Sequence, residues 1–559
     1  SAKRASLFDA KAPRLYSIDA GRPFLKDLAA TLCGAVGGDP ITLADTRIFV
    51  PTRRASRALT EAFAAASAGR SSLLPQIHAL GDIDEDELLL EAGEEIEMAD
   101  LPPAVSPMER RIVLAKFIAR ASHAFEGAEN WATAFGAAKE LASLLDSFYT
   151  EEIPFSRLDD IAPAEFADHW MRSLDFLAIA TKAWPDYLKA RGLMDPAERR
   201  ARLIDLQGEH FKKRPPQTPV IIAGTTGSAP AVARLIKVVA ALPKGAVALP
   251  GLDRALVTDK KAWEAVDDPH PQAGLKSLLA SIGAEPGAVM VWPGSGAPAP
   301  RTALLTLALR PAGATDDWRR LVKEASQDDP TLEKARTGLS LIEAADEEAE
   351  ASAVALLLRE ALERPRKTAM LVTPDRTLGR RVAAKMQRWG VALDDSAGVP
   401  FANSPCGTYL RLVAEWLAAP SDPVAILSVA RARLAGFGLD GQARAIALSA
   451  LDRGLRGVKP ASGFDGLEHK LAGDHAKAAT AIVDALATAA TDWPQEPRAP
   501  FDAYLAAHVA AAERLAADDK DAGPARLWRG DDGEQGAALL AEMRDMAAAL
   551  GDMTGEDYR

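Results

Sequence analysis

Residues 46–63 have the sequence TRIFVPTRRASRALTEAF, and residues 367–390 have the sequence KTAMLVTPDRTLGRRVAAKMQRWG. Each stretch begins with a short apolar run, at residues 48–50 in the first and 370–372 in the second, which predicts a buried β-strand. Each then continues with apolar residues at helical spacing. The sequence therefore predicts one strand, turn and helix unit that is used twice in the chain.

The turns of these two units align on Pro51 and Pro374, which gives P-x-R-x-x-x-R-x-[LV] in both. Thr52 and Asp375 then occupy the same position, where each is expected to cap the following helix. The first turns of both helices carry arginines: Arg53, Arg54, Arg57, Arg376, Arg380 and Arg381. Guanidinium groups beside helix N-termini suit phosphates, so these arginines are predicted to contact a nucleic-acid backbone. Ion pairing with neighbouring carboxylates is the alternative role.

A further strand, helix and strand, the unit of a parallel sheet, is predicted within residues 219–253. Residues 106–207, and those after about 407, instead have helical periodicity. The fold class expected is α/β and helix-rich, with two parallel-sheet domains that each carry a mainly helical insertion. The segments expected are the first α/β domain at 1–100 and 215–335, its helical insertion at 101–214, an incomplete second α/β domain at 336–410, and a second helical insertion at 411–559.

The composition excludes several classes of protein. Two cysteines, Cys33 and Cys406, cannot form a disulfide framework, a four-cysteine zinc site or a four-cysteine iron–sulfur site. No apolar run is long enough to span a membrane, so a cytoplasmic protein without membrane contact is expected. The net charge of −12 does not favour a polyanionic partner, but the charge is segregated, with an acidic run at residues 82–100 and a basic one at 359–388.

The sequence resembles known proteins at several of these points. Residues 369–386, AMLVTPDRTLGRRVAAKM, are similar to the start of the second motor domain of superfamily 1 DNA helicases. The chain resembles the AddB family, the non-motor subunits of AddAB-type helicase–nucleases, in its alphaproteobacterial form. The resemblance is carried by RPFLKDLAATL (22–32), RIFVPTRRASRAL (47–59), LLPQIHALGDIDEDEL (73–88), VIIAGTTGSAPAVARL (220–235), GAVALPGLD (245–253), LVTPDR (371–376) and WGVALDDSAGVPF (389–401).

This resemblance implies two RecA-like domains and a DNA-binding, scaffolding role in double-strand break repair and homologous recombination. The partners implied are an AddA-type helicase subunit and single-stranded or unwinding duplex DNA. The family's nuclease domain, with its iron–sulfur cluster and magnesium, has no counterpart in these residues, so the chain is expected to be the N-terminal part of such a subunit. No catalytic residue, metal site or cofactor is expected in this segment.

The residues of an ATP-driven motor are missing from the sequence. A phosphate-binding loop needs G-x-x-x-x-G-K-[ST], and the expected place after residues 15–18 has DAGRPFLK, in which Gly21 and Lys26 are at best a remnant. The second expected place has VIIAGTTGS, where Gly224 and Thr225 replace the acidic pair that would hold magnesium. Two alternatives remain: an active ATP-dependent DNA helicase with an atypical phosphate loop, and a structural protein whose arginines pair with the acidic run.

Overall fold

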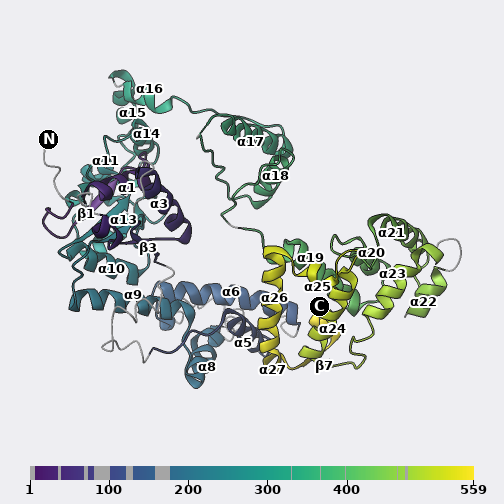
Figure 1. Cartoon of the computed structure of the whole chain (residues 1–559). Coiled ribbons are helices and arrows are strands. Elements are labelled where there is room, and N and C mark those ends of the chain that lie inside the picture. Colours follow the sequence, from purple (N-terminus) through teal and green to yellow (C-terminus); the bar gives the residue numbers. More distant parts are fainter. Residues whose placement is uncertain are drawn as a thin grey trace. The chain divides into compact units, whose positions relative to one another are not determined.

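A computed structural model describes residues 7–35, 40–67, 73–80, 101–120, 130–157, 177–328, 330–365, 367–396, 398–461, 464–471 and 476–559 (Figure 1). The chain forms two compact units, the first mainly of residues up to Arg110 and from 136 to 339, and the second mainly of residues 340–559. The acidic run at 82–100 lies outside the described residues. Within the described part, no helix is both long and apolar enough to cross a membrane.

The first unit contains a six-stranded parallel sheet. Its strands are β1 (Leu15–Ile18), β2 (Arg47–Val50), β3 (Gln76–Ala79), β4 (Val220–Ala223), β5 (Gly245–Pro250) and β6 (Met290–Val291). They lie in the order β3-β2-β4-β5-β1-β6, and Ile48 of β2 lies beside Ile77 of β3 and Ile221 of β4. Both β1 and β4 are buried along their whole length, as is typical of a parallel sheet covered on both faces. The predicted strands at 48–50 and within 219–253 are confirmed.

Helices of the first unit cover both faces of this sheet (Figure 1). Outside residues 101–214, the described helices of this unit are α1 (Phe24–Ala35), α2 (Pro40–Ala44), α3 (Arg53–Ala66), α10 (Pro230–Ala241), α11 (Arg254–Thr258), α12 (Lys260–Glu264), α13 (Ala273–Ile282), α14 (Pro300–Ala308), α15 (Trp318–Asp328) and α16 (Pro330–Arg336). Of these, α1, α2 and α3 contribute to the core on one face of the sheet, and α10 and α13 contribute to the core on the other. Side chains alternate across a strand, so Ile48 packs with α1 and α3 while the neighbouring Phe49 packs with α10 on the other face. The two cores hold the helices that follow each strand in place.

The described part of residues 101–214 is helical. Its elements are α5 (Pro107–Arg120), α6 (Trp131–Thr150), a π-helical turn (Ile179–Ala183), α8 (Trp184–Arg191) and α9 (Pro196–Lys213). A buried ion pair lies among them, because Asp195 accepts hydrogen bonds from the Ala197 N–H at the start of α9 and from Trp184 Nε1, and one of its oxygens lies 3.1 Å from the Arg110 guanidinium. Burial raises the pKa of Asp195, and the Arg110 charge offsets part of that rise.

The second predicted sheet is not formed in the described residues. Residues 370–372 form no strand, contrary to the prediction, and Met370 and Val372 are 82% and 80% exposed. The physical reason is that a strand exists only by hydrogen bonding to a neighbouring strand, and no described segment pairs with this one. The helix predicted after it is confirmed: α18 (Arg376–Gln387) packs against α17 (Glu347–Leu362), with Leu371 in their small apolar core.

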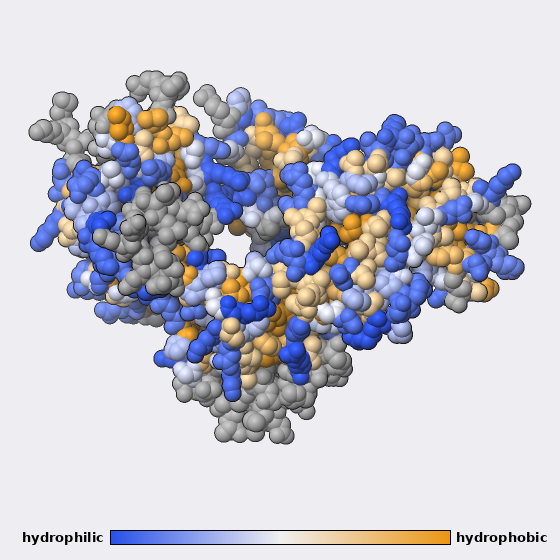
Figure 2. Space-filling model, turned by 60° about the horizontal axis from the view of Figure 1, so that its bottom comes forward, coloured by the Kyte–Doolittle hydropathy of each residue, from blue (hydrophilic) through white to orange (hydrophobic). Residues whose placement is uncertain are grey.

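The rest of the second unit is a helical block around one large apolar core. Its elements are α19 (Pro405–Ala418), α20 (Pro423–Arg431), α21 (Gly441–Leu455), α22 (Phe464–Lys470), α23 (Ala476–Ala489), α24 (Phe501–Ala516), α25 (Gly523–Leu527), α26 (Gly530–Asp545), α27 (Ala547–Leu550) and α28 (Gly555–Tyr558), with a two-stranded ribbon of β7 (Ala499–Pro500) and β8 (Asp552–Met553). Hydrophobic residues also reach the surface in several patches (Figure 2), so burial of apolar side chains is incomplete on this face.

Candidate nucleotide-site remnant and arginine-bearing helix starts

The loops at the carboxyl ends of the sheet strands lie at one edge of the sheet, because all six strands are parallel. The helices after the adjacent strands β2 and β4 leave to opposite faces, since α3 packs in one core and α10 in the other. Ligands of open α/β sheets bind at such a switch point. Gly224, Phe24 and Pro51 meet here: a Cβ added at Gly224 would lie 3.5 Å from the Phe24 ring and 3.8 Å from Pro51.

The loop after β1 is occupied by the chain's own carboxylate. Asp19 Oδ1 accepts hydrogen bonds from the Gly21 N–H at 2.9 Å and from Thr302 Oγ1 at 2.9 Å, and lies 3.4 Å from the Ala299 N–H at the start of α14. In a phosphate-binding loop, backbone N–H groups of this kind bind the phosphates. A phosphate at Gly21 would instead meet the negative charge of Asp19.

Side chains also fill the space around this loop. A Cβ on Gly21 would lie 2.4 Å from Ala299 Cβ, so no room remains beside the glycine on that side. Arg22 turns to Asp27, with Nε 3.0 Å from Oδ2. Lys26 is exposed on the first turn of α1 and makes no ion pair with any described residue. The structure thus brings Gly21 together with Asp19, Ala299 and Thr302. Sequence reasoning missed Asp19, whose only signal was an acidic residue directly after the strand.

The second remnant, Gly224-Thr225, is a folded turn. Gly224 has a φ of +79°, and its N–H donates to the Ala248 carbonyl in the sheet ladder. Thr225 Oγ1 accepts from the Gly227 N–H at 3.1 Å. Thr225 borders a cavity of about 180 Å³ that is lined mainly by apolar side chains, with Arg200 as its one charged residue. The Gly224 N–H and the Thr225 hydroxyl oxygen are therefore both used by the chain itself. Among the described residues, no group of three or more His, Cys, Asp or Glu could hold a metal.

The first set of arginines lies at the start of α3. Thr52 caps this helix as predicted, since its side chain accepts from the Ala55 N–H at 3.1 Å. Arg53, Arg54 and Arg57 are all exposed. Within the described part of the chain, Arg57 has no ion-pair partner, so its charge faces solvent next to the loop after β2.

The second set, at the start of α18, is partly neutralised. Asp375 caps the helix as predicted, accepting from the Thr377 N–H at 2.7 Å. Arg376 lies 3.3 Å from the Asp395 carboxylate and donates to the Gly398 carbonyl, and Arg381 pairs with Glu347 on α17.

Arg380 is exposed and pairs with no acidic residue that the structure describes. Arg376 and Arg381 therefore fit the alternative role of pairing with neighbouring carboxylates. Arg57 on α3 and Arg380 on α18 remain available to bind an anion from outside the chain. The two helices belong to different units.

No protein-family model matches the chain, and a search of curated proteins finds none that is similar to it.

Proposed function

We propose that this chain is a non-motor, DNA-binding and scaffolding subunit of an AddAB-type helicase–nuclease, which acts in double-strand break repair and recombination. The observation that supports the proposal is the loop after β1, where Asp19 accepts the Gly21 N–H that a nucleotide's phosphate would need, while Phe24 lies against Gly224 of the second remnant. The sheet and its switch point are present, while the Gly21 N–H that a phosphate would need is bonded to Asp19. That combination is expected of a helicase domain retained for its DNA-binding surface.

The proposal includes two RecA-like domains. In the first unit, β1 lies inside the sheet between β5 and β6, and the phosphate loop would follow it directly. In the second, residues 370–372 alternate as a strand does: Leu371 packs on α17 and α18, while Met370 and Val372 are exposed. A segment with one side on helices and the other side exposed supports an incomplete α/β domain, in which it would become a strand once further strands and a second helical layer were present.

The DNA contact proposed is to the phosphate backbone of single-stranded or unwinding DNA, with an AddA-type helicase as the motor partner. Arg57 and Arg380 follow equivalent capped helix starts, and neither is paired within the described residues. A guanidinium there adds its charge to the partial positive charge of the helix N-terminus. Local charge of this kind acts within about 8 Å at physiological salt, so the net charge of −12 does not prevent it.

The test is single-strand binding, followed by fluorescence anisotropy on a labelled oligo(dT) of about 30 nucleotides. Changing Arg57 and Arg380 together to alanine is expected to weaken binding and to reduce the slope of log K against log salt by about 1.4, or about 0.7 for each phosphate contact. The matched control changes Arg411 and Arg514, which are already paired with Glu415 and Asp492. The control should bind as wild type does.

Nucleotide binding separates this proposal from the active helicase. Titration calorimetry of the wild-type chain with ATP and magnesium should give no binding heat, because the N–H of Gly21 is already used by Asp19. Binding tighter than about 1 mM would support the alternative of a live motor. A wild-type chain that does not bind oligo(dT) at low salt, or a double variant that binds as tightly as the control, would refute the DNA-binding role.

A further inference from the structure

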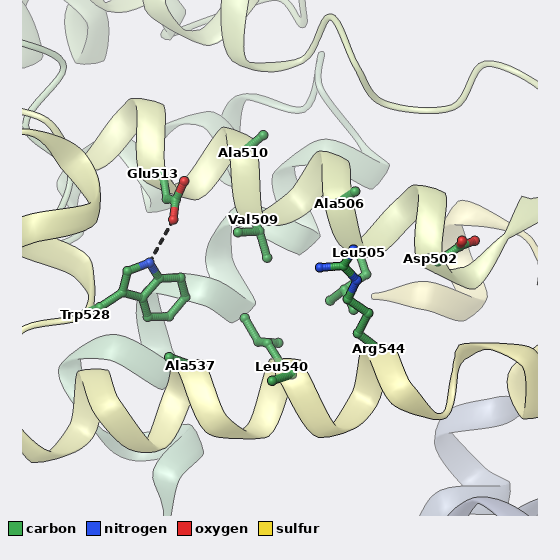
Figure 3. A pocket seen from close by; sticks show the side chains of 11 residues that line it. Asp502, Leu505, Ala506, Val509, Ala510, Glu513, Trp528, Ala537, Leu540 and Arg544 are labelled. Carbon is green, nitrogen blue, oxygen red and sulfur yellow. Dashed lines mark hydrogen bonds between the residues drawn. The ribbon is translucent and has the colours of Figure 1, made fainter.

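A groove in the second unit runs between α24 and α26 (Figure 3). Its centre is apolar, because Val509 of α24 and Leu540 of α26 point toward one another across it. Alanines make its sides: Ala506, Ala510, Ala537 and Ala541. Small side chains on two facing helices keep the sides of the groove low, so another backbone can come close to both.

The dimensions of this groove suit a helix. Its volume is about 520 Å³, and its lining extends along α24 from Asp502 to Glu513, which at 1.5 Å per residue is about 16 Å or three helical turns. Ala506, Ala537 and Ala541 are exposed, so the groove is open along its sides. A small molecule bound there would keep much of its surface in water, whereas ligand pockets usually bury about 70–90% of theirs.

Charge around the groove selects the partner. Residues 501–545 contain ten acidic and five basic side chains, a net charge of −5. One end of the groove is closed by Trp528, whose Nε1 donates to Glu513 at 2.8 Å, and that carboxylate also lines the groove (Figure 3). Asp502 and the exposed Arg544 stand at the other end. Of the charged side chains in this segment, only Asp502, Glu513 and Arg544 line the groove, which gives the lining a net charge of −1. An apolar floor with one carboxylate at each end is complementary to a helix with one apolar and one basic face.

We infer that the α24–α26 groove is a docking site for a basic amphipathic helix of about three turns, supplied by a partner protein. Apolar side chains at positions i, i+3, i+4 and i+7 of that helix lie over Leu505, Val509 and Leu540. Its basic side chains face Asp502 and Glu513. Arg544 is then the one unfavourable charge in the lining. This site is independent of the DNA contacts proposed above, since it uses none of the same residues.

The probe for this inference is a fluorescein-labelled peptide of about 18 residues, with leucines at i, i+3, i+4 and i+7 and lysines on the other face. An acidic analogue has glutamate in place of every lysine. Anisotropy with the full 559-residue chain is expected to show the basic peptide binding at least tenfold more tightly than the acidic one. Arg544→Glu should tighten binding of the basic peptide, and Asp502→Lys should weaken it.

A blocking variant tests the groove itself. Ala541→Trp places a large side chain in the groove at an exposed position, so the fold should be kept, and binding of the basic peptide should fall at least tenfold. Ala538→Trp is the matched control, because Ala538 is exposed on the same helix but does not line the groove. Equal binding of the basic and acidic peptides, or an Ala541→Trp variant that binds like the control, would overturn the inference. The inference would also be overturned if neither peptide bound and the groove took up only a small hydrophobic dye, with Ala541→Trp abolishing the binding of that dye.

Discussion

Replacing Asp195 with alanine tests the buried ion pair in the helical part of the first unit. The Asp195 side chain is fully buried, and the Arg110 side chain is only 8% exposed. The carboxylate serves three partners at once: the N–H of Ala197, Trp184 Nε1 and Arg110. Removing it leaves the Trp184 indole N–H without its acceptor, the buried Arg110 with one carboxylate fewer, and α9 without its cap.

The expected loss of stability follows from these contacts. Breaking a buried ion pair by removing one partner costs about 3–5 kcal/mol. Arg110 keeps a second carboxylate, Asp146 at 2.7 Å, and donates to the Ala142 carbonyl, so the lower end of that range applies. The matched substitution is Asp440→Ala, because Asp440 also caps a helix, α21, but is exposed. That change should cost about 1 kcal/mol, the usual value of an N-cap.

Hydrogen–deuterium exchange with mass spectrometry measures both effects in the whole chain. At about 1.4 kcal/mol for each factor of ten, Asp195→Ala should raise the opening constant of α9 amides about 100-fold, and Asp440→Ala should raise that of α21 amides about fivefold. Each helix serves as the internal reference for the other variant. If the two substitutions increase exchange by the same factor, the ion pair adds nothing beyond the cap, and the reasoning fails.

Two further predictions concern the second unit. Burial lowers the pKa of His508 to about 4, where Nε2 donates to the Leu410 carbonyl and Nδ1 accepts from the Tyr558 hydroxyl. The neutral ring therefore contributes stability that is fully present above the unfolded pKa of about 6.5. As the pH falls from there to about 4, up to about 3 kcal/mol of this stability is lost. His508→Gln should flatten this pH dependence of stability, measured by thermal unfolding. Changing Met370 and Val372 to serine should reduce concentration-dependent self-association, measured by light scattering, because both side chains are exposed. The packing of α17 against α18 should be unchanged in that variant, whereas Leu371→Ser should destabilise this helix pair. Unchanged scattering in the double variant would mean that the exposed apolar residues do not drive association.

Local signals in the sequence were sufficient for part of this fold. The strand and helix at residues 46–63 were predictable, because a short apolar run followed by a capping residue and helical periodicity depends only on neighbours in the chain. The same holds for Thr52 and Asp375 as caps, since each bonds an N–H two or three residues further on. The parallel sheet followed from the strand, helix and strand in residues 219–253.

Tertiary contacts decided the rest. Asp19 occupies its loop together with Thr302 of α14, a residue 283 positions away that no local pattern connects to it. Residues 370–372 have a strand's sequence but no strand beside them, because sheet pairing needs a second segment. Arg376 and Arg381 look like Arg57 and Arg380 in sequence, yet they are paired with Asp395 and Glu347. Propensity and capping act over a few residues and are readable from the chain, whereas pairing of charges and strands depends on which distant residues the fold brings within a few ångströms.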